Sequence, residues 1–309
     1  MAVKAKKTSK SSEATKAKEN KPKRKLFSFS WLTKWRKKKS FVNVVHLHGA
    51  IGQGSAFKSG LTIESMADLL DQAFECKKAK AVALVINCPG GSPVQSSFIG
   101  KRIRDLAVEH KKPVFAFVED VAASGGYWLA CSADEIYADA SSIIGSIGVI
   151  SYGFGFPELL KKHGVERRVY TSGKSKSTLD PFKPEKKEDI AKLKQLQEIV
   201  HQNFIAWIKS RRADALKKSD DFLFNGDFWV AEMAQSYGLI DGIGDIKSVM
   251  QEKYGKKVQF NVIRTEGPWW RKKAQLGVHE NMEGIVNSMT DAVIARVENY
   301  IEQSPMRFK

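Results

Sequence analysis

Cysteines and long apolar runs are scarce in this sequence. Only three cysteines occur in 309 residues, at Cys76, Cys88 and Cys131. Their number is odd and they form no C-x-x-C pair or Cys/His ligand pattern, which argues against a disulfide framework and a structural zinc site. No run of about 18 apolar residues is present, so no transmembrane helix is predicted. We expect free, buried thiols in a reducing compartment.

Acidic residues are scarce only at the N-terminal end. The chain has a net charge of +17, and residues 1–40 hold 15 basic and two acidic residues, which account for +13 of it. The rest of the chain is nearly balanced, at +4. A preference for an anionic partner therefore concerns this basic tail alone. We expect no nucleic-acid partner, because no known nucleic-acid-reading module follows the tail.

The tail contains one apolar and aromatic stretch, Leu26–Trp35 (LFSFSWLTKW), with basic clusters on both sides. It is too short for a secretory signal, and no small-residue cleavage site follows it. Aromatic residues between lysines and arginines suit contact with an anionic membrane surface, whereas a solvated, disordered tail is the alternative. We expect a protein that is peripheral to the cytoplasmic face of a membrane, or cytoplasmic.

Strand and helix patterns alternate after the tail, which predicts an α/β fold with a largely parallel sheet. The run AVALVIN (81–87) is apolar throughout, as in a strand covered on both faces. The domain boundaries expected are 1–40 for the tail, 41–255 for the folded domain and 256–309 for a C-terminal extension. Residues 282–300 have helical apolar spacing, which favours an oligomer contact or a docked helix. The expected strands are 41–47, 81–87, 113–118, 135–139, 141–150 and 165–170, and the expected helices are 62–77, 93–110, 125–131, 157–163, 186–214 and 232–237.

Two glycine-rich turns follow predicted strands. INCPGG (86–91) ends a buried strand, and glycine allows its backbone N–H groups to approach another group closely. Two convergent N–H groups can hold a developing oxyanion. In VAASGGYWLA (121–130), Ser124 stands between a strand and a helix. It suits a nucleophile, but a serine at this position is equally typical of a helix N-cap.

A nucleophilic serine needs a base, and the six histidines do not offer one. No histidine occurs between residues 110 and 163, where a triad of the Clp protease type would need it. His46 and His48 lie on an expected strand without an evident third partner. A lysine acts as a base only where burial lowers its pKa from about 10.4. The loop YTSGKSKSTLDPF (170–182) offers Lys174 and Lys176, although most loop lysines are solvated cations.

Five separated segments occur in the order found in the signal peptide peptidase A family, also called protease IV, which consists of Ser–Lys peptidases. They are INCPGG (86–91), VAASGGYWLA (121–130), IIGSIGVI (143–150), YTSGKSK (170–176) and FNGDFWVAEMAQSYGLIDGIGD (224–245). The chain resembles the half-length form of this family over roughly residues 41–255. The C-terminal 50 residues match no part of the family core that we can place.

The resemblance implies a role for each matched residue. The nucleophile falls on Ser124, the base on Lys176 with Lys174 as the alternative, and the hydroxyl that orients the base on Ser146. The oxyanion hole falls on the N–H groups of Gly91 and Gly125. No cofactor or metal is implied.

The resemblance also implies a Clp/crotonase-like fold of repeated β-β-α units, here with extra C-terminal helices. It implies a ring-like homo-oligomer, in which the serine and lysine can come from neighbouring protomers. The expected substrates are unstructured apolar peptides such as remnant signal peptides. Two rival functions are a crotonase-like acyl-CoA enzyme and a non-catalytic, membrane-associated scaffold.

Overall fold

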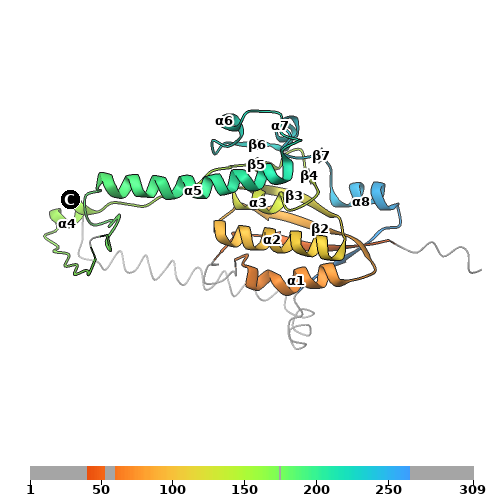
Figure 1. Ribbon diagram of the computed structural model, residues 1–309, viewed down its shortest axis with the longest axis horizontal. Helices are drawn as coiled ribbons and strands as arrows, with labels where there is room; N and C mark the ends of the chain where they lie inside the picture. The colour runs from red at the N-terminus through yellow and green to blue at the C-terminus, as the bar shows by residue number, and fades with distance from the viewer. Residues whose placement is uncertain (1–39, 53–59, 174, 265–309) are drawn as a thin grey trace, which may run out of the picture. The chain divides into compact units, whose positions relative to one another are not determined.

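A computed structural model describes residues 40–52, 60–173 and 175–264, and its centre is an eight-stranded sheet (Figure 1). The strand order is β6-β5-β3-β2-β1-β8, and β4 pairs with both β3 and β7. Every pair is parallel except β5 with β6. The strands are β1 (Phe41–His48), β2 (Ala79–Cys88), β3 (Val114–Ala123), β4 (Glu135–Ala138), β5 (Ile143–Gly145), β6 (Phe228–Val230), β7 (Gly242–Ile243) and β8 (Gln259–Val262). The predicted parallel sheet is confirmed.

Helices cover both faces of the sheet, as the apolar β2 strand requires. Val82, Leu84 and Ile86 of β2 lie in the main core with α1, α2 and α3, whereas Ala83 and Val85 face a second core that includes α8. Because both faces are buried, β2 has no polar side to alternate with its apolar side. The helices are α1 (Ile63–Glu75), α2 (Pro93–His110), α3 (Gly125–Ala130), α4 (Pro157–Lys162), α5 (Lys187–Arg212), α6 (Asp220–Leu223), α7 (Ala231–Ser236) and α8 (Ile246–Tyr254).

The repeated β-β-α units are visible as a short extended segment between each long strand and its helix. After β1, Ile51 forms parallel bridges with Leu61 and Gly91, and Gly91 itself follows β2. The end of β3 stays paired with β2 after a register shift, and on its other side β5 replaces β4 as its neighbour. The α/β class with these units is therefore confirmed, whereas the helix expected within 256–309 lies outside the described residues.

Two of the three free thiols are buried as expected, whereas Cys76 is partly exposed. Cys88 and Cys131 are buried and free, and burial raises their pKa values to about 11 and about 12. Thiols of this kind are unreactive. In the part of the chain that the structure describes, no helix is both long and apolar enough to span a membrane.

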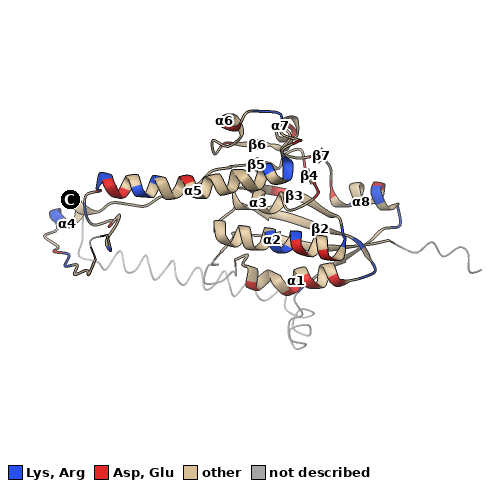
Figure 2. Ribbon diagram, viewed as in Figure 1, with Lys and Arg blue, Asp and Glu red and all other residues tan. Residues whose placement is uncertain are grey.

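The long helix α5 packs on the domain through its C-terminal half only. Trp128 of α3 stacks between Phe204 and Trp207 of α5, with ring centroids 5.0 Å and 5.9 Å apart. In the other half, Leu196 and Ile199 are each about half exposed. Figure 2 shows charges of both signs along this half. The apolar side chains of α5 therefore extend beyond the surface that covers them in one chain.

One predicted strand is wrong in this structure. Residues 165–170 have no regular secondary structure, and Val165 and Tyr170 are exposed. A strand needs a neighbour for its backbone N–H and C=O groups, and no described segment of the chain pairs with this one. The sheet also continues past residue 255, since β8 pairs with β1. The tail (1–39) and the amphipathic segment 282–300 lie outside the described residues.

A buried ion pair joins the end of α5 to the turn before β7. The guanidinium of Arg212, only 5% exposed, donates to both carboxylate oxygens of Asp241, at 3.0 and 3.1 Å, and twice to the Gly238 carbonyl. Removing one partner of such a pair leaves a buried charge without compensation. The pair therefore holds the C-terminal half of α5 in place.

Asp241→Asn should lower the free energy of unfolding by about 3 kcal/mol, because it leaves the Arg212 cation buried beside a neutral amide. Asp105→Asn is the matched control, since Asp105 forms an exposed pair with Lys101. The control should change stability by less than about 0.5 kcal/mol. Urea unfolding measures both variants, and equal losses would contradict the importance of the buried pair.

Candidate active site

Ser124 lies on a strained turn between β3 and α3. Its φ and ψ angles are 51° and −123°, a region that residues other than glycine rarely occupy. Its backbone N–H donates to the Gly145 carbonyl at 2.8 Å. Its side chain makes no capping hydrogen bond with α3. Ser124 therefore occupies the N-cap position of α3, as one interpretation expected, but its hydroxyl does not cap the helix and is left for another use.

The Pro-Gly-Gly turn after β2 packs directly against this serine. A Cβ atom on Gly90 would lie 2.8 Å from the Ser124 Cβ, and one on Gly91 would lie 2.1 Å from the Ile51 carbonyl oxygen. Gly91 also has a φ of +142°. The close contact with Ile51 and the positive φ both require glycine at position 91.

Two backbone donors at this contact have no acceptor. Among the described residues, nothing accepts a hydrogen bond from the N–H of Gly91 or from the N–H of Gly125. Gly91 lies two residues before the start of α2 and Gly125 begins α3, and the Gly90 contact brings the two turns together. Two such donors beside a serine can stabilise a negatively charged oxygen.

Ser146 lies next to Ser124 in the sheet. Ala123 of β3 pairs with Gly145 of β5, so the two serines follow paired positions on adjacent parallel strands. Adjacent strands lie about 4.8 Å apart. Ser146 also has a positive φ, of 52°, and its N–H donates to the Asp227 carbonyl at 2.7 Å. The structure thus brings Ser124, Ser146 and the two glycine turns into one place.

Lys176 does not join this group within one chain. It is exposed, in a turn near the start of α5, where the Leu179 N–H donates to the Asp189 carboxylate at 3.2 Å. The Ser146 region lies further along α5, because His201 contacts the Ile147 carbonyl at 3.2 Å. The twelve residues from Asp189 to His201 span about 18 Å of helix. The other lysine, Lys174, lies outside the described residues.

A second polar cluster lies at the same edge of the sheet. His48 Nε2 is 3.2 Å from His46 Nδ1 and 3.1 Å from a Glu119 carboxylate oxygen. Burial, and then the neighbouring His48, lower the pKa of His46. The sequence showed the two histidines but not Glu119, which the pairing of β1, β2 and β3 brings close to them. Among the described residues, no group of three or more His, Cys, Asp or Glu side chains is suited to hold a metal ion.

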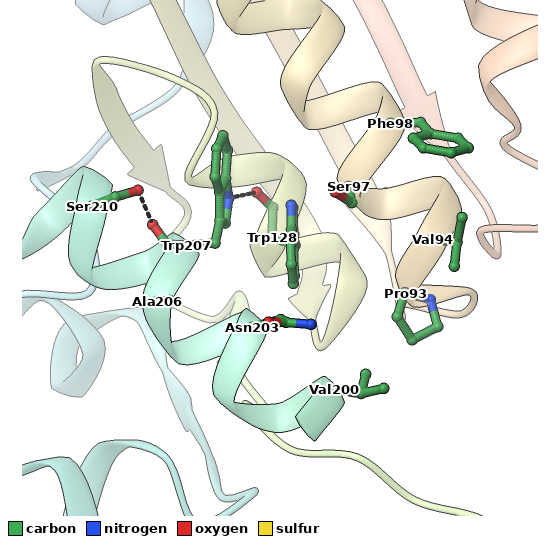
Figure 3. A pocket seen from close by; sticks show the side chains of 10 residues that line it. All are labelled: Pro93, Val94, Ser97, Phe98, Trp128, Val200, Asn203, Ala206, Trp207 and Ser210. Carbon is green, nitrogen blue, oxygen red and sulfur yellow. Dashed lines mark hydrogen bonds between the residues drawn. The ribbon is translucent and has the colours of Figure 1, made fainter. Parts of the chain in front are cut away.

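A cleft of about 560 Å³ opens beside the site, between α2, α3 and α5. Figure 3 shows Pro93, Val94 and Phe98 on one wall, Val200 and Trp207 on the other, and Trp128 between them. Its walls are mainly apolar. The sequence did not reveal it, because its residues come from three segments that only the fold brings together.

Comparison with known proteins identifies the chain's relatives. Residues 107–259 match the model of peptidase family S49. The chain belongs to peptidase family S49. This confirms the resemblance to the protease IV group, which the motifs indicated.

Relatives from this group carry protease names. Protease 4 of Haemophilus influenzae is 32% identical over 215 residues, which are 68% of this chain and 34% of that one. The chloroplastic serine protease SPPA of Arabidopsis thaliana is 28% identical over 264 residues, covering 79% of this chain and 38% of that one.

A more similar sequence has a different name. The Na(+)/H(+) antiporter NhaA of Brucella abortus is 56% identical over 239 residues, covering 77% of this chain and 32% of the antiporter. The chain therefore spans about a third of the length of each of these three relatives. Two solved structures of the 1510-N membrane-bound stomatin-specific protease align with TM-scores of 0.48 and 0.45. They are 18% and 19% identical and cover 76% and 73% of this chain, and 96% and 98% of the solved chains.

The strain at Ser124 predicts an unusual effect of glycine. Ser124→Gly should raise the free energy of unfolding by about 1 kcal/mol, because glycine relieves the left-handed backbone and this gain exceeds its entropy cost. Ser92→Gly is the control, since Ser92 has a φ of −58° and caps α2. It should lower stability. Thermal or urea unfolding tests both, and a Ser124→Gly variant less stable than the parent would contradict the strain.

Proposed function

We propose that the protein is a serine endopeptidase in which Ser124 is the nucleophile. The observation that carries this proposal is the contact between the two turns. It leaves the Ser124 hydroxyl without a capping role and places two unpaired N–H groups beside it. A serine with a purely structural role does not need unpaired N–H groups beside its hydroxyl. Acyl transfer needs both a free hydroxyl and donors that hold the oxyanion. Membership of peptidase family S49 supports the same reaction class.

The proposed chemistry is acyl transfer with a lysine base. Neutral Lys176 takes the proton from the Ser124 hydroxyl, and the oxygen attacks the peptide carbonyl carbon. The N–H groups of Gly91 and Gly125 hold the oxyanion while Ser146 orients the amine. The lysine then protonates the leaving amine, and it activates the water that hydrolyses the acyl-enzyme. This scheme uses side chains and backbone groups of the protein only.

We further propose that serine and lysine pair between neighbouring protomers. The separation along α5 supports this, since about 18 Å of helix lies between the Asp189 and His201 contacts. The region between β5 and α5, which contains Lys176, also exposes large apolar side chains that a second copy could cover. Three of them are 80% to 89% exposed: Tyr152, Phe154 and Tyr170. A ring-like homo-oligomer would satisfy both requirements, and an isolated protomer would then be inactive.

The proposed substrates are unstructured, apolar peptides such as remnant signal peptides. The apolar cleft beside Ser124 favours substrates of this kind. The basic tail of residues 1–40 would bring the enzyme to an anionic membrane surface, where such peptides accumulate. The proposed location is therefore the membrane periphery.

Ser124→Ala should reduce cleavage of an unstructured apolar reporter peptide by at least about a thousandfold, because the acyl-enzyme cannot form. Ser92→Ala is the control and should keep near-parental activity. If Ser124→Ala still cleaves the reporter, the peptidase proposal is wrong and an acyl-CoA enzyme that uses only the oxyanion hole becomes the better explanation. A variant lacking residues 1–40 should lose binding to anionic vesicles but cleave a soluble peptide normally. A parent protein that binds the vesicles and cleaves no peptide would favour the scaffold.

Co-expression of two inactive variants tests the pairing between protomers. Ser124→Ala and Lys176→Ala should each be inactive, and mixed oligomers should recover activity at about a quarter of their sites if pairing is random. Lys174→Ala is the matched control and should stay active. No recovery in mixed oligomers would show that both residues of a site come from one chain.

The dependence of activity on pH tests the lysine base. A lysine accepts a proton only in its neutral form, so kcat/KM should rise from acidic to neutral or alkaline pH. The measurement is the initial rate on one reporter peptide over pH 5 to about 10. A profile that is already at its maximum near pH 5 would contradict a lysine base.

A further inference from the structure

The turn that contains Ser146 is strained, and backbone contacts hold it on one side. Ser146 has a φ of 52°, in the left-handed region that residues other than glycine rarely adopt. Its N–H donates to the Asp227 carbonyl at 2.7 Å, and the preceding carbonyl, of Gly145, accepts from the Ser124 N–H at 2.8 Å. A strained residue of this kind persists only where its surroundings fix it. The position of the Ser146 hydroxyl therefore depends on the groups that hold this turn.

The Asp227 carbonyl belongs to a tight turn of its own. The Asn225 side chain accepts from the Asp227 N–H at 2.8 Å and donates to the Asp227 carboxylate at 3.0 Å. A Cβ atom on Gly148 would lie 3.1 Å from the Gly226 Cα, so the two turns are in close contact. This side of the Ser146 turn is therefore fixed by a second turn that has its own hydrogen bonds.

The other side of the Ser146 turn depends on one side chain, that of His201 in α5. The imidazole Nε2 lies 3.2 Å from the carbonyl oxygen of Ile147, the residue that follows Ser146. A carbonyl oxygen can only accept, so Nε2 carries the hydrogen of this bond. Ile147 is completely buried, and within the described ranges no other group donates to its carbonyl. Loss of the imidazole would leave that oxygen buried without a partner.

His201 also connects the Ser146 turn to the helix that packs beside the nucleophile. Phe204, three residues further along α5, stacks on Trp128 of α3, which follows Ser124 by four residues. One helix therefore contacts the segment after each of the two serines. A rigid helix in this position fixes the spacing between their hydroxyl groups.

We infer that His201 is a positioning residue, which holds the Ser146 hydroxyl in place through the Ile147 carbonyl. That hydroxyl aims the amine of the lysine base at the nucleophile. This inference rests on the proposed function and adds to it a residue that the motifs did not indicate. A misplacement of about 1 Å can cost about a hundredfold in rate, so a loosened turn should slow the chemical step. Substrate binding should change little, because His201 does not line the cleft.

The test compares three substitutions of His201 in the full chain, with an unstructured apolar fluorogenic peptide as the substrate. His201→Leu should lower kcat by about tenfold or more and change KM by less than about threefold. His201→Gln should keep kcat within about threefold of the parent, since its amide N–H can replace the imidazole donor. His201→Asn has the same amide on a shorter side chain and should behave like His201→Leu. It provides the measurement if the leucine variant does not fold.

A second measurement separates positioning from general support of the fold. Ser146→Ala removes the hydroxyl on which His201 acts. In that background, His201→Leu should change kcat by less than about twofold, because residues that act as a unit are not additive. A residue that only supports the fold would lower kcat by the same factor in both backgrounds. Gln202→Leu is the matched control and should keep the parental kcat, since Gln202 is exposed on the same helix and bonds Glu198 at 2.7 Å.

Three outcomes would overturn the inference. Equal losses for His201→Leu and His201→Gln would show that the imidazole itself takes part in proton transfer. The same loss in both backgrounds would assign His201 a role in the fold alone. A parental kcat for His201→Leu would show that the Ile147 carbonyl needs no such donor. Failure of the proposed function is distinguishable, because Ser124→Ala would then cleave the peptide as the parent does, whichever residue stands at position 201.

Discussion

The close contact between the ends of β2 and β3 is the constraint on which the rest of the site depends. Both strands are parallel and end at the same edge, where each passes through a glycine turn into a helix. A Cβ atom on Gly126 would lie 2.1 Å from the Cys88 carbonyl oxygen, so only glycine allows α3 to begin this close to β2. This approach puts the Gly91 and Gly125 N–H groups beside Ser124 and forces the strained backbone of that serine.

The α3 helix connects the two glycine turns to the rest of the domain through its packing. Its six residues are all buried, and Trp128 forms the contact with the C-terminal half of α5. The Arg212 ion pair holds the end of α5 against the turn at Asp241. The α5 helix therefore packs against α3, which follows Ser124, with its C-terminal half, and its N-terminal end contacts the segment that contains Lys176. Under the proposed pairing between protomers, the complete site depends on where a second copy packs.

Sequence patterns predicted the long elements well and the short ones poorly. The helix at Pro93–His110 has a capping serine and Pro at its start, and β2 is apolar throughout, so each had a strong local signal. The two- to four-residue strands β6, β7 and β8 have no measurable period, and they exist only because a neighbouring strand accepts their hydrogen bonds. Residues 165–170 have strand-like composition but lack such a neighbour in one chain, so the prediction there was wrong.

By itself, the sequence determined the parallel α/β class, the free thiols, the family and the set of candidate residues, because these follow from local composition and from the order of motifs. Only the tertiary structure decided that the Ser124 hydroxyl does not cap α3, that Ser146 lies beside it and that an apolar cleft lies nearby. It also separated Lys176 from Ser124 along α5. Strand register and helix packing join residues far apart in sequence, and no local pattern encodes those distances.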